Sequence, residues 1–259
     1  MSCKVSVIVP MWNAAGTIGR CLRSIEGQTL GGLEAVIVDD CSTDGSVEEA
    51  ERTVSGFGKA VRYRILKTPV NLGPAGARNF GLKEAEGEYV AFLDADDTLE
   101  PTFCEKLFAC GTDLAHCDIR IIAPDGSSAI KENPRESDKR KYLLRYKSFF
   151  TTYLYRRSLL RDCGIVFPDS RSAEDSCFLA CAIMQAGSIS GVEEALYNYF
   201  RDAGSVSLSR NRKRASWRLY SFRALRRYVR EHRLPFRREA LWLSLKKGFA
   251  MALKDILFG

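Results

Sequence analysis

The stretch YVAFLDADDT, residues 89–98, joins five apolar and aromatic residues to three aspartates within four positions. The segment Tyr89–Leu93 has the length and composition of a buried strand. Carboxylates this close together raise one another's pKa and destabilise a fold unless a cation or a ligand balances them. The alternative is a polar turn that caps the next helix, because aspartate is favoured in both places. Three aspartates at the carboxyl end of one apolar strand favour a ligand site.

Short apolar strands alternate with helical patterns through the first hundred residues. Strands are expected at 5–9, 35–38, 61–66 and 89–93, and helices at 17–28, 47–54 and 75–85. This order predicts an α/β fold with a Rossmann-like, mainly parallel sheet, right-handed crossovers and helices on both faces. Ligands of such sheets bind beyond the carboxyl ends of the strands. The segments 10–13, 39–40 and 94–97 should converge there.

Beyond Pro101 the pattern is less regular. Strands are expected at 114–123 and 195–200, helices at 157–163 and 174–186, and a charged surface segment at 131–147. The net charge of +7 is also unevenly distributed. Residues 209–259 hold 15 Lys/Arg against 3 Asp/Glu, a balance of +12, which leaves −5 for residues 1–208. We therefore divide the chain into a mildly acidic α/β domain, 1–208, and a basic, amphipathic helical region, 209–259.

Composition narrows the class of protein. No apolar run in the sequence reaches the roughly 18 residues of a membrane-spanning helix. The N-terminal apolar run is too short for a secretory signal, and nine cysteines without a C-x-x-C pair indicate a reducing compartment. Only two histidines are present, which argues against structural zinc. We expect a cytoplasmic protein, peripheral on the inner face of the cell membrane.

Carboxylates spaced D-x-D suit a hard divalent cation, Mn²⁺ or Mg²⁺, that also binds substrate phosphates. Neither a Walker loop nor a G-x-G-x-x-G motif after the first strand occurs in the sequence. A nucleoside diphosphate held by a metal at Asp94 and Asp96 is the remaining interpretation.

Six segments, in order along residues 3–208, resemble the family 2 glycosyltransferases with the GT-A fold. They are KVSVIVPMWN, VIVDDCSTDGS, NLGPAGARNFGL, GEYVAFLDADDTL, AEDSCF and YNYFRDAGSVS. The resemblance implies an inverting, metal-dependent transfer of sugar from a nucleotide-sugar, expected to be a UDP-sugar. The acceptor would be a hydroxyl of a polysaccharide or of a lipid-linked glycan of the cell envelope.

The resemblance also implies roles for single residues. Asp175 would be the base that deprotonates the acceptor hydroxyl, and Asp96 would bind the metal with Asp94 beside it. In the nucleobase pocket the Trp12 ring would stack and Asp39 would accept the imide N–H of uracil. The other residues expected to bind the donor are Pro10, Arg78, Asp94, Asp97, Arg201 and Ser205, the last two in a loop that closes over the diphosphate.

Each role has a structural alternative. Trp12 could be a core residue, Arg78 a surface ion pair, and Glu174-Asp175 an ordinary acidic pair in a first helical turn. Three places depart from the family pattern. Cys41 stands where glycine is usual, Met11-Trp12 replaces the commoner pair of a small residue and tyrosine, and Thr152-Tyr153 stands where a lysine is frequent. The first two changes remove no proposed donor ligand, and the third concerns the acceptor side.

Two other functions remain open from the sequence. The segment Asp94–Thr98 also satisfies the D-x-D-x-T motif of haloacid-dehalogenase-type phosphatases, in which Asp94 would be the nucleophile. That motif usually follows the first strand of such folds, and here it follows the fourth. A membrane-associated scaffold without turnover is the non-enzymatic alternative, although Asp96 and Asp175 are intact.

The basic region, 209–259, predicts two amphipathic helices separated at Pro235. They could pack on the catalytic domain or bind an anionic membrane through their arginines. Nucleic acid is not expected, because no binding motif accompanies the charge. We expect the arginines of 211–231 to face lipid. We expect an apolar stripe to pack on the domain, consisting of Leu241, Leu245, Phe249, Ala252 and Ile256.

Overall fold

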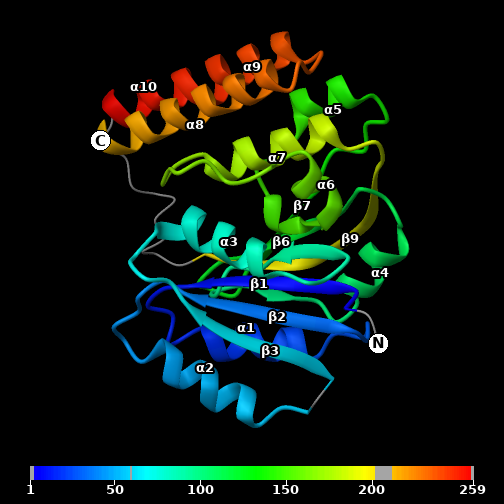
Figure 1. Cartoon of the computed structure of the whole chain (residues 1–259), viewed down its shortest axis with the longest axis vertical. Coiled ribbons are helices and arrows are strands. Elements are labelled where there is room, and N and C mark those ends of the chain that lie inside the picture. Colours follow the sequence, from blue (N-terminus) through cyan, green and yellow to red (C-terminus); the bar gives the residue numbers. More distant parts are fainter. Residues whose placement is uncertain (1–2, 59, 202–211, 258–259) are drawn as a thin grey trace.

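The computed structural model describes residues 3–58, 60–201 and 212–257 (Figure 1). The first half contains β1 (Val5–Met11), α1 (Ile18–Glu26), β2 (Leu33–Asp39), α2 (Ser46–Ser55), β3 (Val61–Lys67), α3 (Gly73–Glu84), β4 (Tyr89–Phe92), β5 (Thr98–Leu99) and α4 (Phe103–Ala109). Every helix and strand expected before residue 94 is present, with ends shifted by a few residues. The alternation of apolar strands and amphipathic helices was therefore sufficient to predict the elements from β1 to β4, whereas β5 and α4 were not predicted.

The second half is less regular. It contains β6 (Leu114–Ile122), β7 (Ser128–Lys131), α5 (Lys139–Arg145), the 3₁₀ turn η1 (Phe150–Thr152), β8 (Tyr153–Arg156), α6 (Arg157–Asp162), α7 (Glu174–Gln185) and β9 (Ile189–Phe200). The C-terminal helices are α8 (Arg212–Glu231), α9 (Arg237–Leu243), the π-helical segment η3 (Ser244–Phe249) and α10 (Ala250–Leu257). None of the helices in the described ranges has the length and apolar content needed to cross a membrane.

The strands form one mixed sheet in the order β3-β2-β1-β4-β8-β6-β9-β5, with β7 paired to β6. The first four strands are parallel, as expected. Strand β8 runs antiparallel to both β4 and β6, so the second half of the sheet mixes directions. Because Ala91 of β4 pairs with Leu154 of β8, the start of β8 lies at the carboxyl end of β4. The turn η1 therefore lies at the same edge of the sheet as the aspartate-rich turn.

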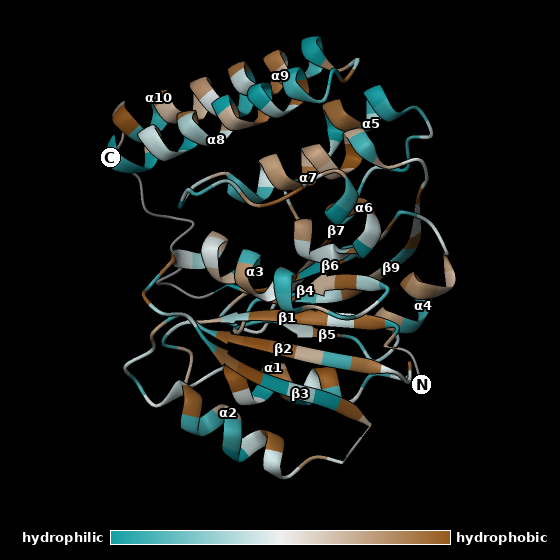
Figure 2. Cartoon of the chain, viewed as in Figure 1, coloured by the Kyte–Doolittle hydropathy of each residue, from teal (hydrophilic) through white to brown (hydrophobic). Residues whose placement is uncertain are grey.

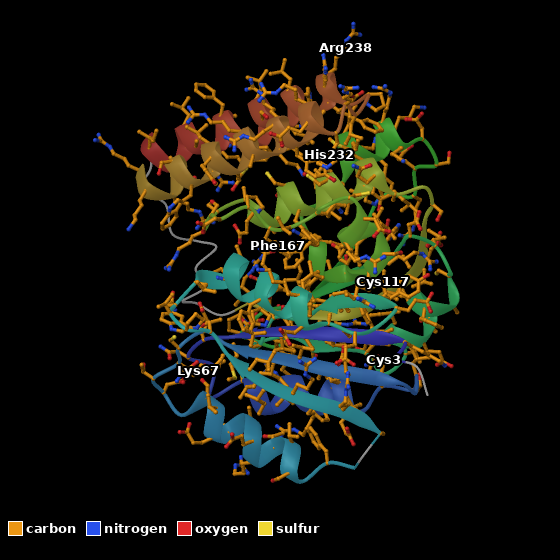
Figure 3. All side chains as sticks on the ribbon, in the orientation of Figure 1. Cys3, Lys67, Cys117, Phe167, His232 and Arg238 are labelled. Carbon is orange, nitrogen blue, oxygen red and sulfur yellow. The ribbon has the colours of Figure 1, made fainter. Side chains whose placement is uncertain are left out.

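Helices cover both faces of this sheet (Figure 1). One core contains side chains of β1, β2 and β4 packed with those of α3, α7 and α8, and the other packs the sheet against α1, α2 and α4. The strands β1 and β2 are strongly hydrophobic along most of their length (Figure 2). Phe167, labelled in Figure 3, stacks on Phe178 of α7 with ring centroids 3.9 Å apart. The ring of Phe92 in β4 also lies 5.5 Å from that of Phe178 (between centroids), so aromatic packing joins the sheet to α7.

The expectation of a charged surface segment at 131–147 is wrong in part. Helix α5 lies within it, and Tyr142, Leu143 and Tyr146 are buried. The phenol of Tyr142 lies 2.7 Å from that of Tyr153, and the Tyr146 hydroxyl donates to the Ser176 carbonyl at 2.9 Å. These partners allow tyrosines in a highly charged sequence to enter the core.

The expected packing of the C-terminal helices is also wrong in part. Leu241, Leu245, Phe249 and Ile256 are 45–58% exposed, whereas Ala252 is buried. The buried face of α9–α10 combines Leu243 with small residues, among them Ala240 and Gly248. A Cβ atom at Gly248 would lie 2.9 Å from the Phe222 ring. Close helix packing at such a position needs a small residue, and the predicted stripe of larger apolar side chains lies on the exposed face.

Helix α8 shares its core with α7, because Phe222, Leu225 and Val229 belong to the cluster that includes Phe178. The proposed boundary at residue 208 lies outside the described residues. In Figure 1 the helices α8 and α9–α10 form a hairpin above α7, on the side of the molecule opposite α2.

Candidate active site

The carboxyl ends of β1 and β2 lie side by side, and hydrogen bonds tie their loops together. The Asn13 N–H donates to Ser42 Oγ at 3.0 Å, and Asn13 Oδ1 accepts from the Thr43 N–H at 2.9 Å. The Ala14 N–H donates to Ser46 Oγ at 2.7 Å. Asn13 has a φ of 49°, in the left-handed region that asparagine tolerates. The two loops therefore form one fixed rim at this edge of the sheet.

Trp12 and Asp39 lie on this rim with different exposure. The Trp12 ring is 58% exposed, which excludes the alternative that it is a core residue, and Pro10 before it is partly buried. Asp39 is 1% exposed, and its Oδ1 accepts from the Ser42 N–H at 3.0 Å. Its Oδ2 is buried and has no hydrogen-bond partner among the described residues. A buried carboxylate oxygen without a donor is costly, so this atom is suited to the N–H of a ligand.

The neighbouring Asp40 has a structural role. Its Oδ1 accepts from the Leu72 N–H at 2.8 Å and from the Thr68 hydroxyl at 2.9 Å, and its Oδ2 accepts from the Gly73 N–H at 2.7 Å. A carboxylate at the N-terminus of a helix satisfies free N–H groups and is favoured by the helix dipole. Asp40 thereby fixes the start of α3.

Arg78 of α3 connects two acidic segments. It is 6% exposed, and its Nη2 lies 2.8 Å from Asp94 Oδ1 while its Nη1 lies 3.7 Å from Glu174 Oε1. Its guanidinium lies over the Phe150 ring, 4.6 Å from the centroid, and 5.5 Å from that of Phe167. This burial excludes the alternative of a surface ion pair. Arg78 brings the aspartate-rich turn and the start of α7 into one cluster.

The three aspartates of the opening stretch differ in environment. Asp97 is 1% exposed, and its two oxygens accept from the Tyr197 hydroxyl at 2.6 Å and from the Phe200 N–H at 2.9 Å. Burial, followed by the charges of Asp94 and Asp96, raises the pKa of Asp97 to about 8. The carboxyl of Asp97 is turned into the protein, which favours a supporting role over the donor contact that we expected.

Asp94 and Asp96 are both partly exposed at the strand end. Arg20 of α1 donates from Nη2 to the Asp96 carbonyl at 2.6 Å, and its guanidinium lies 3.7 Å from the centroid of the Phe200 ring. Arg20 was not predicted as a site residue. It lies in an amphipathic helix with no motif around it, so only its three-dimensional position relates it to this turn.

The first turn of α7 carries Glu174 and Asp175. Glu174 is 8% exposed, and burial, followed by the charge of Asp175, raises its pKa to about 7 against the lowering effect of Arg78. Asp175 is half-buried and accepts from the Ser176 N–H at 2.6 Å. Burial raises its pKa as well, opposed by that hydrogen bond, Arg78 and Lys247. Carboxyls with raised pKa beside a fixed cation are candidates for proton transfer.

Two residues of the expected loop over the diphosphate are only partly accounted for. The backbone N–H of Arg201 donates to the Ile122 carbonyl at 2.9 Å, and its side chain is exposed. Ser205 lies outside the described residues. The role of both in donor binding stays a prediction.

A metal site at the aspartates would be shared with substrate. Among the described residues no three His, Cys, Asp or Glu side chains converge into a cage of protein ligands. Magnesium-type ions commonly use one or two carboxylates together with substrate phosphates. Asp94 and Asp96 supply hard oxygen donors of that kind, although Asp94 Oδ1 is already paired with Arg78. These residues would fit a divalent cation with Asp96 as its main protein ligand.

Comparison with known proteins gives consistent results. The family model described as "Glycosyl transferase family 2" matches residues 6–164. An uncharacterized glycosyltransferase of Bacillus subtilis, EpsJ, is 32% identical over 219 residues, which are 78% of this chain and 62% of EpsJ. The poly(ribitol-phosphate) β-N-acetylglucosaminyltransferase TarS of Staphylococcus aureus is 32% identical over 206 residues, 76% of this chain and 35% of TarS. The chain thus spans less than two thirds of the length of these relatives.

Solved structures show the same likeness. The crystal structure of TarS residues 1–349 in complex with UDP-GlcNAc has a TM-score of 0.71 and 27% identity, over 87% of this chain and 66% of that one. The mannosyltransferase PcManGT of Pyrobaculum calidifontis, in complex with GDP-Man and Mn²⁺, has a TM-score of 0.60 and 21% identity. The match covers 98% of this chain and 74% of PcManGT, and at this identity it shows the fold alone.

Proposed function

This chain belongs to glycosyl transferase family 2 and has its GT-A fold, and on that premise we propose that it transfers a sugar from a nucleotide-sugar to an acceptor hydroxyl with inversion. The observation that carries the proposal is the buried Arg78. Its guanidinium holds Asp94 of the aspartate-rich turn and Glu174, next to Asp175, within one cluster. The groups expected to bind the donor and to activate the acceptor are therefore adjacent.

The nucleotide of the donor is proposed to be UDP. Asp39 Oδ2 is a buried acceptor without a partner among the described residues, and it is suited to the imide N–H of uracil. Exposed Trp12 supplies a ring on which a base can stack. The UDP-GlcNAc complex of TarS supports a UDP-sugar over other donors.

A divalent cation, Mn²⁺ or Mg²⁺, is proposed at Asp96 and Asp94. When bound, it supplies positive charge that stabilises the leaving diphosphate. Arg78 adds a positive charge on the protein side, because its guanidinium is buried and paired with Asp94. The buried carboxylate of Asp97 holds the aspartate-rich turn in place by accepting hydrogen bonds from the Tyr197 hydroxyl and the Phe200 N–H.

Asp175 is proposed as the general base. Its carboxylate accepts the proton of the acceptor hydroxyl, whose oxygen forms a bond to the anomeric carbon as the bond to the diphosphate breaks. Attack on the face opposite the leaving group inverts the configuration. Glu174, held by Arg78, orients the first turn of α7 and hence Asp175. The acceptor is proposed to be a polysaccharide or a lipid-linked glycan.

The C-terminal helices are proposed to dock on an anionic membrane at the cytoplasmic face. The exposed side chains of five arginines line a groove between α8 and α9: Arg223, Arg226, Arg227, Arg230 and Arg237. Leu241 also lines this groove, and Leu245 and Phe249 are further exposed apolar side chains of the C-terminal helices. Cations beside an exposed apolar stripe complement lipid phosphates beside acyl chains.

A phosphatase that uses Asp94 as nucleophile is the weaker alternative. Asp94 Oδ1 is paired with Arg78, the motif follows the fourth strand, and the family match covers the whole region. The family match, together with the presence of Asp96 and Asp175, also disfavours a scaffold without turnover.

The proposal is tested with a panel of nucleotide-sugars. Thermal unfolding with Mn²⁺ should show stabilisation by UDP-sugars, since a ligand at 100 times its Kd adds about 2.7 kcal/mol. Asp96→Asn should lose this metal-dependent effect and the transfer activity while remaining folded, because neutralisation eases the repulsion between carboxylates. Asp125→Asn, in the exposed β6–β7 turn, is the matched control.

Three results would contradict the proposal. They are transfer by Asp96→Asn at the wild-type rate, wild-type activity that persists in EDTA, and hydrolysis of p-nitrophenyl phosphate without release of UDP. The last of these would favour the phosphatase.

A further inference from the structure

An open groove lies where the C-terminal helices meet the catalytic half of the chain. Three segments line it: the end of β7, residues 146–149, and η3. Each segment contributes one lysine, namely Lys131, Lys147 and Lys247. Glu132 is the one acidic residue among the lining residues, so the groove has a net positive charge.

This groove adjoins the proposed base. The Tyr146 hydroxyl donates to the Ser176 carbonyl at 2.9 Å, and the Ser176 hydroxyl donates to Ser148 Oγ at 2.5 Å. Ser176 follows Asp175 directly, so the floor of the groove is bonded to the first turn of α7. Residues 146–149 also lead into Phe150, whose ring packs on Arg78. Residues 146–150 therefore contact both the groove and the cluster around Arg78 in the proposed donor site.

Lys247 is the most enclosed of the three lysines. Its Nζ donates to the Tyr146 carbonyl at 3.0 Å and lies 3.5 Å from the centroid of the Tyr146 ring. Burial lowers its pKa to about 8, and the charge of Asp175 opposes that shift. None of the three lysines forms an ion pair with a carboxylate within the described residues. Partial burial of an unpaired ammonium is costly, so an anion from outside would be its natural counterpart.

We propose that this groove is the acceptor subsite, and that it selects acceptors that carry a phosphate ester near the hydroxyl to be glycosylated. The inference rests on the proposed glycosyl transfer, and it names the acceptor class for that reaction. Lysines from three segments can meet the oxygens of one phosphate as point charges. A phosphate held there also needs neutralisation so close to the carboxylate of Asp175, and Lys247 supplies it.

The proposal also gives the C-terminal helices a part in the active site. Lys247 comes from η3, more than seventy residues after Asp175 in the sequence. Helices that appear in the sequence as a basic appendage would then complete the acceptor side of the catalytic centre.

Binding of sn-glycerol 3-phosphate and of uncharged glycerol, measured by calorimetry on the full chain, tests the proposal. We expect saturable binding of the phosphate only. Lys247→Met should weaken it about tenfold, as expected for loss of a charged hydrogen bond, and Lys247→Arg should restore most of it. Lys131→Gln changes an exposed residue that cannot affect folding strongly, and it should weaken binding several-fold. Lys246→Met is the matched control, because Lys246 is exposed and lies over the Trp242 ring at 4.6 Å instead of lining the groove.

Equal binding of glycerol and its phosphate, no saturable binding, or equal losses in Lys246→Met and Lys247→Met would overturn the proposal. A dodecyl phosphate arm distinguishes two sources of the phosphate. Tighter binding than glycerol phosphate, with the same dependence on Lys247, assigns a lipid-linked acceptor, and equal binding assigns a soluble one. UDP binding is measured in every variant and should not change. Absence of UDP binding by the wild type would contradict the proposed UDP-sugar donor and not the groove.

Discussion

Charged side chains are arranged differently around the strand ends and on the C-terminal helices. Around the strand ends Arg78, Asp40 and Asp97 are buried. Arg78 donates a hydrogen bond to Asp94, and the two carboxylates accept hydrogen bonds from Gly73 and Tyr197. On α8 and α9 the arginines of the groove, Arg226 and Arg227 among them, are exposed and form no ion pair within the described residues. Fixed charges suit a small ligand whose reacting atoms must be placed closely. A row of unpaired arginines suits an extended anionic surface, for which no single geometry is required.

The lysine groove lies between these two arrangements. Lys247 is half-buried and hydrogen-bonded like the charges at the strand ends, yet it lacks a carboxylate partner like the arginines of α8. Ion pairs also hold the C-terminal helices. Arg218 of α8 forms a buried pair with Asp255 of α10 at 3.1 Å, and half-exposed Arg140 of α5 pairs with Glu239 of α9. The helices that carry the unpaired arginines and Lys247 are therefore held together, and to the rest of the chain, by ion pairs.

The largest effect is expected from Asp175→Asn, in the first turn of α7 that Arg78 and Glu174 link to the strand ends. The amide cannot accept the proton of the acceptor hydroxyl, so transfer should fall at least about 100-fold, the low end of what loss of a general base costs. Donor affinity, measured by calorimetry with UDP, should stay within about twofold. Asp162→Asn, at an exposed carboxylate of α6, should leave both quantities unchanged. An equal loss of donor affinity would make Asp175 a binding residue and would place the base elsewhere.

How much the sequence predicts also differs between the regions. Strands β1–β4 and their helices follow from hydrophobic alternation alone, and the carboxyl ends of parallel strands meet by geometry, so the rim of Trp12, Asp39 and Asp94 could be located in advance. The different roles of Asp39 and Asp40 could not be predicted, because they depend on which of the two carboxylates accepts hydrogen bonds from the start of α3. The burial of Asp97 depends likewise on Tyr197, a hundred residues later in the chain.

The second half was predicted less well for physical reasons. Helix α5 is highly charged in sequence, and its core tyrosines are recognisable only through hydroxyl partners on β8 and α7. The outward stripe of α9–α10 follows from the close approach of α8 at Gly248, which no helical period reveals. Cys41 replaces the usual glycine, and its φ of 64° explains why glycine is favoured at that position. These features depend on contacts that are distant in sequence.

A smaller effect is expected from the exposed arginines. Each basic residue near an anionic bilayer contributes about 1 kcal/mol, so Arg226→Gln/Arg227→Gln should weaken binding to phosphatidylserine-containing vesicles roughly 30-fold. Co-sedimentation at low and high salt measures this, and binding should weaken as salt screens the charges. The control is Arg23→Gln/Arg52→Gln, which makes the same change of charge at exposed positions of α1 and α2.

Equal binding to neutral and anionic vesicles, or equal losses in both double variants, would exclude the arginine groove as a lipid site. The arginines would then differ from the charges at the strand ends only in exposure and not in function.

The smallest effect concerns the stability of the paired charges themselves. Glu174 has its pKa raised from an ordinary 4.5 to about 7, chiefly by burial. Between these pH values the folded state retains a proton that the unfolded state has lost, so stability falls as pH rises through this window and then stays lower. Glu174→Gln removes the titration. The variant should therefore match the wild type near pH 5 and exceed it near pH 8 by about 1 kcal/mol, since coupling to Asp175 divides the shift between two carboxyls. Chemical unfolding at both pH values measures this difference, with Glu51→Gln on exposed α2 as a control that should show none.

A variant that is less stable at pH 8 than at pH 5, relative to the wild type, would mean that the ion pair with Arg78 outweighs burial. Buried charges at the strand ends would then contribute stability as well as geometry.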